Sequence, residues 1–150
     1  MQLTQKETML LQDLKSQEQL CVEKYRKYTE QTCDEPLKKL FASIGQTEQT
    51  HLDTITQMLS GTVPMMTGGS DSSQQQATPQ ASCSENEKKQ DAYLCQDALG
   101  TEKHVSSTYN TCIFEFKDAQ ARNVLNHIQK EEQDHGKRIY DYMAANGMYA

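Results

Sequence analysis

The chain has 150 residues, a formal net charge of −6 and no tryptophan. This length is sufficient for a buried core, and we expect residues 1–150 to form a single domain. Abundant Glu, Gln, Lys and Leu favour amphipathic helices over sheets. The 15 basic residues do not cluster, which argues against nucleic acids and anionic membranes as partners.

Sequence signals for export and for cysteine chemistry are weak. The N-terminus lacks the apolar segment of a secretory signal, and no apolar run approaches the roughly 20 residues of a membrane span. The cysteine count is odd, at five, and no C-x-x-C motif occurs, so we expect neither a disulfide framework nor a zinc ribbon. The protein is therefore expected to be made in a reducing cytoplasm. We expect Cys21, Cys95 and Cys112 to fill the core, and Cys33 and Cys83 to be exposed thiols.

Hydrophobic periodicity predicts four helices, over about residues 5–31, 35–60, 85–113 and 119–146. Each follows a residue type that commonly caps helices, in order Thr4, Asp34, Ser84 and Asp118. A glutamate three residues after Thr4, and another three residues after Ser84, complete the spacing of a capping box. The helices therefore pair into two hairpins, at residues 4–60 and 84–146.

Residues 61–83 separate the hairpins and are rich in Gly, Pro, Ser and Gln, as is typical of a linker. Such a segment can extend over roughly 70 Å, whereas a helix of about 27 residues is roughly 40 Å long. We therefore expect a crossover that runs along the whole bundle. The alternative is a flexible tether between two independent hairpins, but each hairpin alone would expose its apolar stripe.

Glutamate and histidine residues interrupt the apolar stripes of all four predicted helices. The first and third helices carry a lone glutamate, and the second and fourth carry a Glu-x-x-His pair that projects from one helix face. In chain order these residues are Glu18, Glu48, His51, Glu102, Glu132 and His135. Buried carboxylates are costly without a partner, and this set matches the ligands of ferritin-like bundles that hold two metal ions.

We therefore predict an all-α fold, a ferritin-like antiparallel four-helix bundle made of two repeated hairpins with one long crossover. Its centre is expected to bind two divalent metal ions, Fe or Mn, with Zn as a further option, because the ligands combine oxygen and nitrogen. The alternative is a bundle that keeps the same groups as a hydrogen-bonded polar network.

The second half of the chain repeats the first at a constant offset, which relates Glu18 to Glu102 and Tyr25 to Tyr109. In each half, both glutamates of the set lie equally far from the intervening turn, roughly 22 Å along a helix. If the hairpins pack head to tail, the six side chains meet near the middle of the bundle. The hydroxyls of Tyr25 and Tyr109 could then help to order the site, although core tyrosines with polar tips are more common.

Several further polar residues are expected to play no part in the centre. His104 and His127 have no symmetric partner, and we expect them at the surface or at the core edge. Lys130 and Glu131 are expected on the outer surface of their helix.

Three stretches of the chain are distinctive. They are LTQKETMLLQDLKSQEQLCVEKY near the N-terminus, DAYLCQDALGTEKHVSSTYNTCIFEF in the third helix and HIQKEEQDHGKRIYDYMAANGMY at the end. They resemble the spore-coat F (CotF-like) proteins of endospore-forming bacteria, over nearly all of the chain except the linker. The resemblance implies a ferritin-like fold and a place in the spore coat after synthesis in the mother-cell cytoplasm. It implies other coat proteins as partners, and it does not by itself imply an enzyme.

The wider ferritin-like group includes ferritins, rubrerythrins and manganese catalases, and their metal ligands would carry over to the same six residues. Two departures stand against a rubrerythrin-type peroxidase. Val105 occupies the position where rubrerythrins have a further inward carboxylate, and their C-x-x-C iron module is missing.

Three hypotheses about function follow. The first is a structural coat component, since tyrosine, glutamine, lysine and cysteine side chains are open to cross-linking. The second is a di-iron or di-manganese oxidoreductase with catalase, peroxidase or ferroxidase-like activity. The third is a coat protein whose metal ions mainly hold the bundle together. We favour a structural role with a metal centre of unknown use, and a homo-oligomer is an option.

Overall fold

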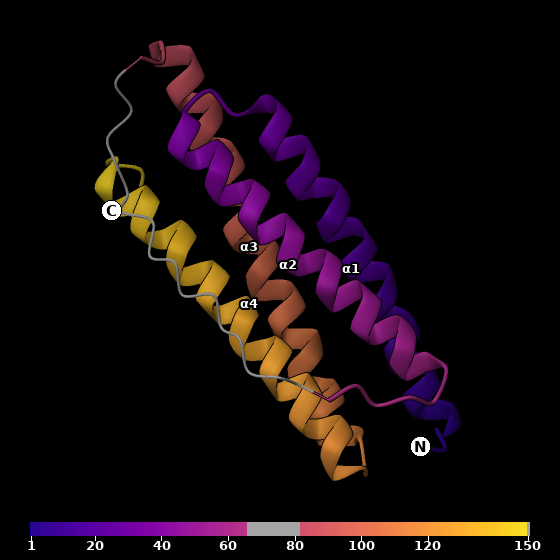
Figure 1. Cartoon of the computed structure of the whole chain (residues 1–150). Coiled ribbons are helices and arrows are strands. Elements are labelled where there is room, and N and C mark those ends of the chain that lie inside the picture. Colours follow the sequence, from indigo (N-terminus) through magenta and orange to yellow (C-terminus); the bar gives the residue numbers. More distant parts are fainter. Residues whose placement is uncertain (66–81, 150) are drawn as a thin grey trace.

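The computed structural model describes residues 1–65 and 82–149 and contains four helices in this part of the chain. They are α1 (Gln5–Gln31), α2 (Glu35–Leu59), α3 (Glu85–Glu115) and α4 (Ala119–Ala145). The helices lie side by side along one long axis, and the two termini lie at opposite ends of the bundle (Figure 1). The all-α prediction is confirmed, and each predicted helix agrees with the structure within about two residues at either end.

Capping boxes begin α1 and α3, as their sequences predict. The Thr4 hydroxyl accepts a hydrogen bond from the Glu7 amide, and the Glu7 carboxylate accepts one from the Thr4 amide. Ser84 and Glu87 make the same pair of bonds at the start of α3. Two amides that the helix leaves without a partner are satisfied in this way at each start.

The two aspartates that precede α2 and α4 behave differently. Asp118 accepts from the Ala121 amide at 2.8 Å and caps α4, as expected. Asp34 occupies the N-cap position of α2, but its side chain makes no capping bond. It accepts instead from the Tyr142 hydroxyl at 2.7 Å. The prediction of Asp34 as the N-cap of α2 is therefore confirmed in position, but a buried tyrosine on α4 takes the carboxylate that would otherwise bond to the helix.

Reciprocal bonds join the start of each hairpin to the turn of the other. The Glu7 carboxylate also accepts from the Lys117 amide at 3.2 Å, in the turn between α3 and α4. Asp91 accepts from the amides of Cys33 and Asp34, at 3.0 and 3.1 Å, in the turn between α1 and α2. Asp91 is the equivalent of Glu7 in the second half, so the repeat extends to these carboxylates. The hairpins thus pack head to tail.

Apolar side chains form two core clusters, and the polar residues of the set lie between them. In α1, Leu11 and Leu14 belong to one cluster, whereas Tyr25 and Tyr28 belong to the other. Glu18 lies between these two stretches and is fully buried. The other three helices show the same order of apolar, polar and apolar segments. The bundle therefore places one polar layer at mid-height.

The two ends of the predicted linker lie at opposite ends of the bundle. Residue Gly61 ends α2 with a positive φ of 89°, and its carbonyl accepts from the Met1 amino group at 3.0 Å. Cys83, at the other end of the segment, lies beside the turn between α1 and α2. This placement agrees with the predicted crossover, although residues 66–81 of the predicted linker at 61–83 lie outside the described residues.

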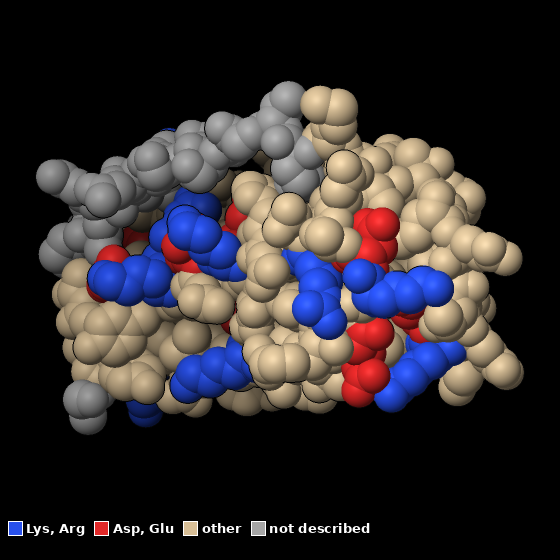
Figure 2. Space-filling view, turned by 90° about the horizontal axis from the view of Figure 1, so that it is seen from below, with Lys and Arg blue, Asp and Glu red and all other residues tan. Residues whose placement is uncertain are grey.

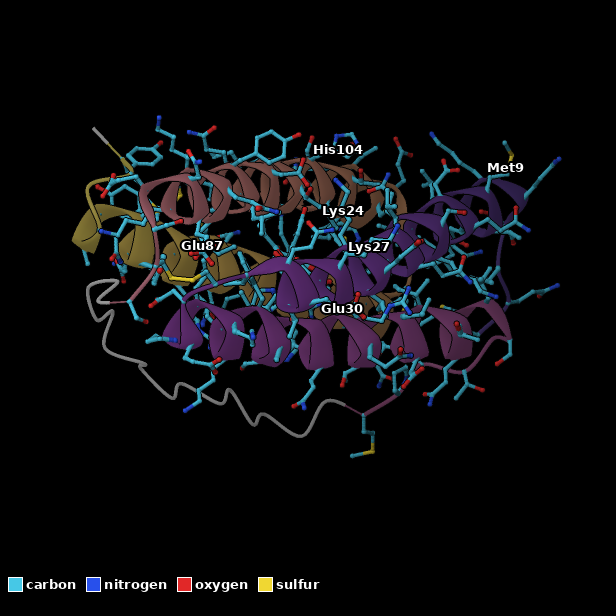
Figure 3. The ribbon with its side chains drawn as sticks, turned by 90° about the horizontal axis from the view of Figure 1, so that it is seen from above. Met9, Lys24, Lys27, Glu30, Glu87 and His104 are labelled. Carbon is cyan, nitrogen blue, oxygen red and sulfur yellow. A yellow bond between two sulfur atoms is a disulfide. The ribbon has the colours of Figure 1, made fainter. Side chains whose placement is uncertain are left out.

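Cys33 and Cys83 form a disulfide, with Cα atoms 6.1 Å apart. Figure 3 shows the bond in yellow close to Glu87 in the first turn of α3. The prediction of two exposed thiols is therefore wrong. The cysteine count and spacing gave no sign of this pair, because its members are 50 residues apart and meet only when the hairpins pack. The remaining three cysteines are free and buried, as predicted.

The outer surface of the bundle is strongly charged. On the face shown in Figure 2, lysine and arginine side chains lie next to aspartate and glutamate side chains. None of the described helices combines the length and the apolar character that crossing a lipid bilayer requires.

Candidate metal centre

All six residues of the predicted set lie together in the core, and none is more than 3% exposed. They form two overlapping groups whose candidate ligand atoms lie within 4.8 Å of one another. One group is Glu18, Glu48, His51 and Glu132, and the other is Glu48, Glu102, Glu132 and His135. Every helix contributes, so the site exists only when both hairpins are packed. We call these six residues the centre.

The Glu-x-x-His pairs of the two hairpins contact one another. Nδ1 of His51 lies 2.9 Å from Oε1 of Glu132, and Nδ1 of His135 lies 2.9 Å from Oε1 of Glu48. The imidazole centroids are 5.9 Å apart and the rings are inclined by 29°. Each histidine therefore turns Nδ1 toward the carboxylates of the other hairpin, and Nδ1 is the nitrogen available to a metal ion there.

Two tyrosines donate hydrogen bonds to the lone glutamates, and each bond crosses from one hairpin to the other. The Tyr25 hydroxyl lies 2.5 Å from Oε1 of Glu102, and the Tyr109 hydroxyl lies 2.6 Å from Oε1 of Glu18. The favoured prediction, simple core tyrosines with polar tips, is thus incomplete. Both rings are fully buried, and both hydroxyls also orient a carboxylate of the centre.

Among the described residues, three carboxylate oxygens of the centre accept no hydrogen bond from a tyrosine, an imidazole or a backbone amide. They are Oε2 of Glu18, Oε2 of Glu102 and Oε2 of Glu132, each shielded from solvent. Unpartnered buried oxygens are rare and costly in proteins, because burial removes the water that would otherwise solvate them. Cations bound between the carboxylates would give these oxygens the partners they lack, and the two groups of donor atoms fit a pair of metal ions.

Burial and mutual contact divide the carboxyl groups of the centre into two kinds. Burial, together with the nearby carboxylates of Glu48 and Glu132, raises the pKa of Glu18 and of Glu102 well above the usual value. Burial also acts to raise the pKa of Glu48, but hydrogen bonds from His135 and His51 outweigh it and lower this pKa well below the usual value. Hydrogen bonds from Glu102 and from both imidazoles likewise outweigh burial and lower the pKa of Glu132.

The two imidazoles hold protons strongly in the absence of metal. Burial acts to lower the pKa of His51, but its contacts with Glu131, Glu132 and Glu48 raise it well above the usual value. Contacts with three glutamates raise the pKa of His135 similarly. With one proton on each of Glu18 and Glu102 and one extra proton on each imidazole, the centre would carry no net charge, because the two imidazolium charges balance Glu48 and Glu132. Two divalent ions carry the same total charge as these protons and could take their place.

Glu131 is a member of the site that the sequence prediction missed. Its Oε1 lies 3.1 Å from Nε2 of His51 and 3.1 Å from Nε2 of His127. The prediction that Glu131 lies on the outer surface of its helix is therefore wrong. The repeat could not reveal it, because the equivalent of Glu131 in the first half is Thr47. The available signal was its spacing of four residues from His127, which places both side chains on one helix face.

The two other histidines lie where the sequence analysis expected them. His127 is at the core edge, with its side chain 27% exposed. His104 is exposed on the outer side of α3, as Figure 3 shows. Neither belongs to the two groups of candidate ligands.

Comparison with known proteins finds a family match for one segment of the chain and a solved structure with a similar fold. Residues 90–150, which include most of α3 and all of α4, match the Coat F domain. No curated protein matches the chain. A solved two-domain protein from Anabaena variabilis ATCC 29413, containing DJ-1/ThiJ/PfpI-like and ferritin-like domains, is similar with a TM-score of 0.70 at 18% sequence identity.

That similarity covers 96% of this chain but only 38% of the Anabaena chain, so the match is to one part of that longer protein. At this identity the likeness establishes the fold and nothing about activity. The resemblance predicted from the sequence motifs is confirmed over residues 90–150, which match the Coat F family, and the fold is ferritin-like. The stretch near the N-terminus lies outside the matched residues.

Proposed function

We propose that the protein is a structural component of the bacterial endospore coat whose bundle holds two divalent metal ions at its centre. The match of residues 90–150 to the Coat F domain is the observation that carries the coat assignment. The three buried oxygens without partners carry the metal assignment. Their chemistry, with two imidazole nitrogens, suits Fe or Mn, with Zn as a further option.

The metal ions would act mainly on stability. Each group of candidate ligands draws on at least three helices, so a bound ion joins segments from both hairpins. The ligands must be deprotonated and assembled before they can bind, and the free energy of binding then adds to that of folding. Two ions held by the centre would therefore stiffen the middle of the bundle.

The Cys33–Cys83 disulfide supports a final location outside the reducing cytoplasm. The proposal is that the protein is made in the mother-cell cytoplasm and then joins the coat, where thiols can oxidise. Other coat proteins are its proposed partners, and further copies of the same chain are an alternative. The described helices offer charged surfaces for such contacts, together with exposed apolar side chains such as Leu20, Tyr93 and Phe114.

Fractionation of sporulating cells tests the location, and elemental analysis tests the metal. We expect antibody detection in the coat fraction of purified spores, and about two metal ions per chain in protein isolated without chelators. Protein that stays in the vegetative cytosol contradicts the coat assignment. Less than one ion per chain contradicts the metal assignment.

A di-iron or di-manganese oxidoreductase, with catalase, peroxidase or ferroxidase-like activity, is the second candidate. One observation favours it: Glu48 and Glu132 belong to both groups of candidate ligands, so two ions would share bridging carboxylates. Such a pair of redox metals supplies two electrons for peroxide or oxygen chemistry. Turnover by metal-loaded wild-type protein that is abolished in Glu48→Gln would support an enzyme. Absence of turnover in the wild type would contradict the enzyme and leave the structural role as the proposed function.

A further inference from the structure

We propose that Glu131 makes the two ion positions unequal, so that the position beside His51 binds its ion more tightly and fills first. This inference rests on the proposed metal centre. The His51 position is the group Glu18, Glu48, His51 and Glu132, and the His135 position is the group Glu48, Glu102, Glu132 and His135.

Both nitrogens of His51 are engaged, and they face in different directions. Nδ1 lies 2.9 Å from Oε1 of Glu132, inside the centre, and Nε2 lies 3.1 Å from Oε1 of Glu131, at its edge. A metal ion can replace only the proton on Nδ1, while the N–H at Nε2 continues to donate to Glu131. Glu131 therefore holds the ring in the tautomer and orientation that present the Nδ1 lone pair to the ion.

His135 lacks this support. Its Nδ1 lies 2.9 Å from Oε1 of Glu48, but the described residues supply no carboxylate partner for its Nε2. The repeat places Thr47 where a counterpart of Glu131 would be needed. The Thr47 hydroxyl donates to the Ser43 carbonyl of its own helix, at 3.5 Å. The His135 ring therefore enters the centre without a carboxylate behind it.

The charge of Glu131 favours the same position. The four carboxylates of the centre balance two divalent ions, and Glu131 adds a fifth negative charge on the His51 side alone. A carboxylate behind a ligating imidazole also makes that imidazole a better donor. A second contact, 3.1 Å from Nε2 of His127, restrains Glu131 from outside, so the Glu131 side chain loses little further freedom when the ion binds.

Titration of the metal-free full-length chain with Co²⁺, followed by visible absorbance and calorimetry, tests the proposal. We expect two binding steps whose Kd values differ by about tenfold or more. Glu131→Gln should weaken the tighter step by about 10- to 100-fold and leave the weaker step unchanged. Thr47→Glu should strengthen the weaker step, and Thr47→Gln, its uncharged control, should not.

A second readout separates positioning from general stability. In Co²⁺-loaded protein, the Nε2 proton of a ligating histidine gives a strongly shifted NMR signal that disappears when the proton exchanges with solvent. We expect one such proton to exchange slowly in the wild type because Glu131 holds it. It should exchange fast in Glu131→Gln and be partly protected again in Glu131→Asp.

Two outcomes overturn the inference but leave the metal centre standing. One is a wild type that binds two Co²⁺ ions with equal affinity, and the other is a Glu131→Gln variant in which both steps weaken equally. Wild-type protein that binds no Co²⁺ overturns the metal centre itself, and the inference with it.

Discussion

The two hairpins supply matching groups to the centre, namely one lone glutamate, one Glu-x-x-His pair and one tyrosine each. Away from the centre they differ. The amides of Cys33 and of Lys117, its equivalent in the second half, each donate to a carboxylate of the other hairpin, but Cys33 also forms a disulfide. Thr47 likewise stands where the second hairpin has Glu131.

The comparison shows where symmetry is constrained. Each group of the centre has its partner in the other hairpin, so the loss of one side would leave a buried charge on the other, at a cost of several kcal/mol. The outer helix faces and the side chain at position 33 bury no charge and carry no such penalty. There the halves can differ, and these differences could have given one turn a disulfide and one histidine a supporting carboxylate.

Removal of the metal ions should lower the stability of the bundle more than any other change, because the ions join side chains from both hairpins. Two ions, each present at about one hundred times its Kd, stabilise the bundle by about 5 kcal/mol in total. A chelator should therefore lower Tm by about 10–20 °C, measured by circular dichroism or calorimetry. Glu48→Gln removes a ligand shared by both positions, so its Tm should not respond to the chelator. A Tm of the wild type that is equal with and without chelator would contradict the proposed structural role of the ions.

Metal affinity should rise steeply with pH. In the metal-free protein, raised pKa values allow the centre to hold up to four protons, on Glu18, Glu102, His51 and His135. Two ions displace these protons, so their joint affinity rises by up to about 10⁴-fold per pH unit. Calorimetry in two buffers of different ionisation enthalpy counts the protons released. Release of none would show that the ions do not occupy these side chains.

Stability of the metal-free protein should change with pH in the opposite direction. A group whose pKa is raised by folding stabilises the fold below its unfolded pKa, and this contribution is lost as pH rises. The loss begins above the usual 4.5 for Glu18 and Glu102 and above 6.5 for the histidines. The difference in Tm between metal-bound and metal-free protein should thus widen from about pH 5 to pH 8. A constant difference would argue against this protonation pattern.

Reduction of the disulfide should test the unequal turns. The bond closes a loop across a sequence separation of 50 residues, so its loss should cost about 2–4 kcal/mol and lower Tm by about 5–15 °C. The double variant Cys33→Ser/Cys83→Ser should show the same loss and no further response to reductant. At the other turn, Glu7→Gln should cost only about 1 kcal/mol, with or without reductant. Equal losses at the two ends would refute the difference between the turns.

Sequence periodicity alone was sufficient to predict the helices and to place the six residues of the centre on buried faces. The caps at Thr4 and Ser84 are local patterns, and so they were predicted correctly. The constant offset between the two halves added the register between the hairpins, because it relates groups that lie at the same height. Each of these inferences needs only information within one helix or one repeat.

The features that were missed depend on which helices face each other. The Cys33–Cys83 bond and the contact of Asp34 with Tyr142 join residues that no local pattern relates. Glu131 was assigned to the surface because the position beside a buried residue usually points outward, yet its carboxylate turns back to His51. A residue that differs from its equivalent in the other half, as Glu131 differs from Thr47, cannot be identified from the repeat.

The smallest expected difference, that between the two tyrosines that contact the centre, gives the sharpest test of symmetry. Tyr25→Phe and Tyr109→Phe each remove the donor from one carboxylate of the centre, which should cost about 1.5–3 kcal/mol in the metal-free protein. The environments match, so the two free energies of unfolding, measured by urea denaturation, should agree within about 0.5 kcal/mol. Tyr93, which is 67% exposed, supplies the control, since Tyr93→Phe should change stability by less than about 0.5 kcal/mol. A Tyr25→Phe cost far above that of Tyr109→Phe would mean that the halves are already unequal inside the centre, independently of Glu131.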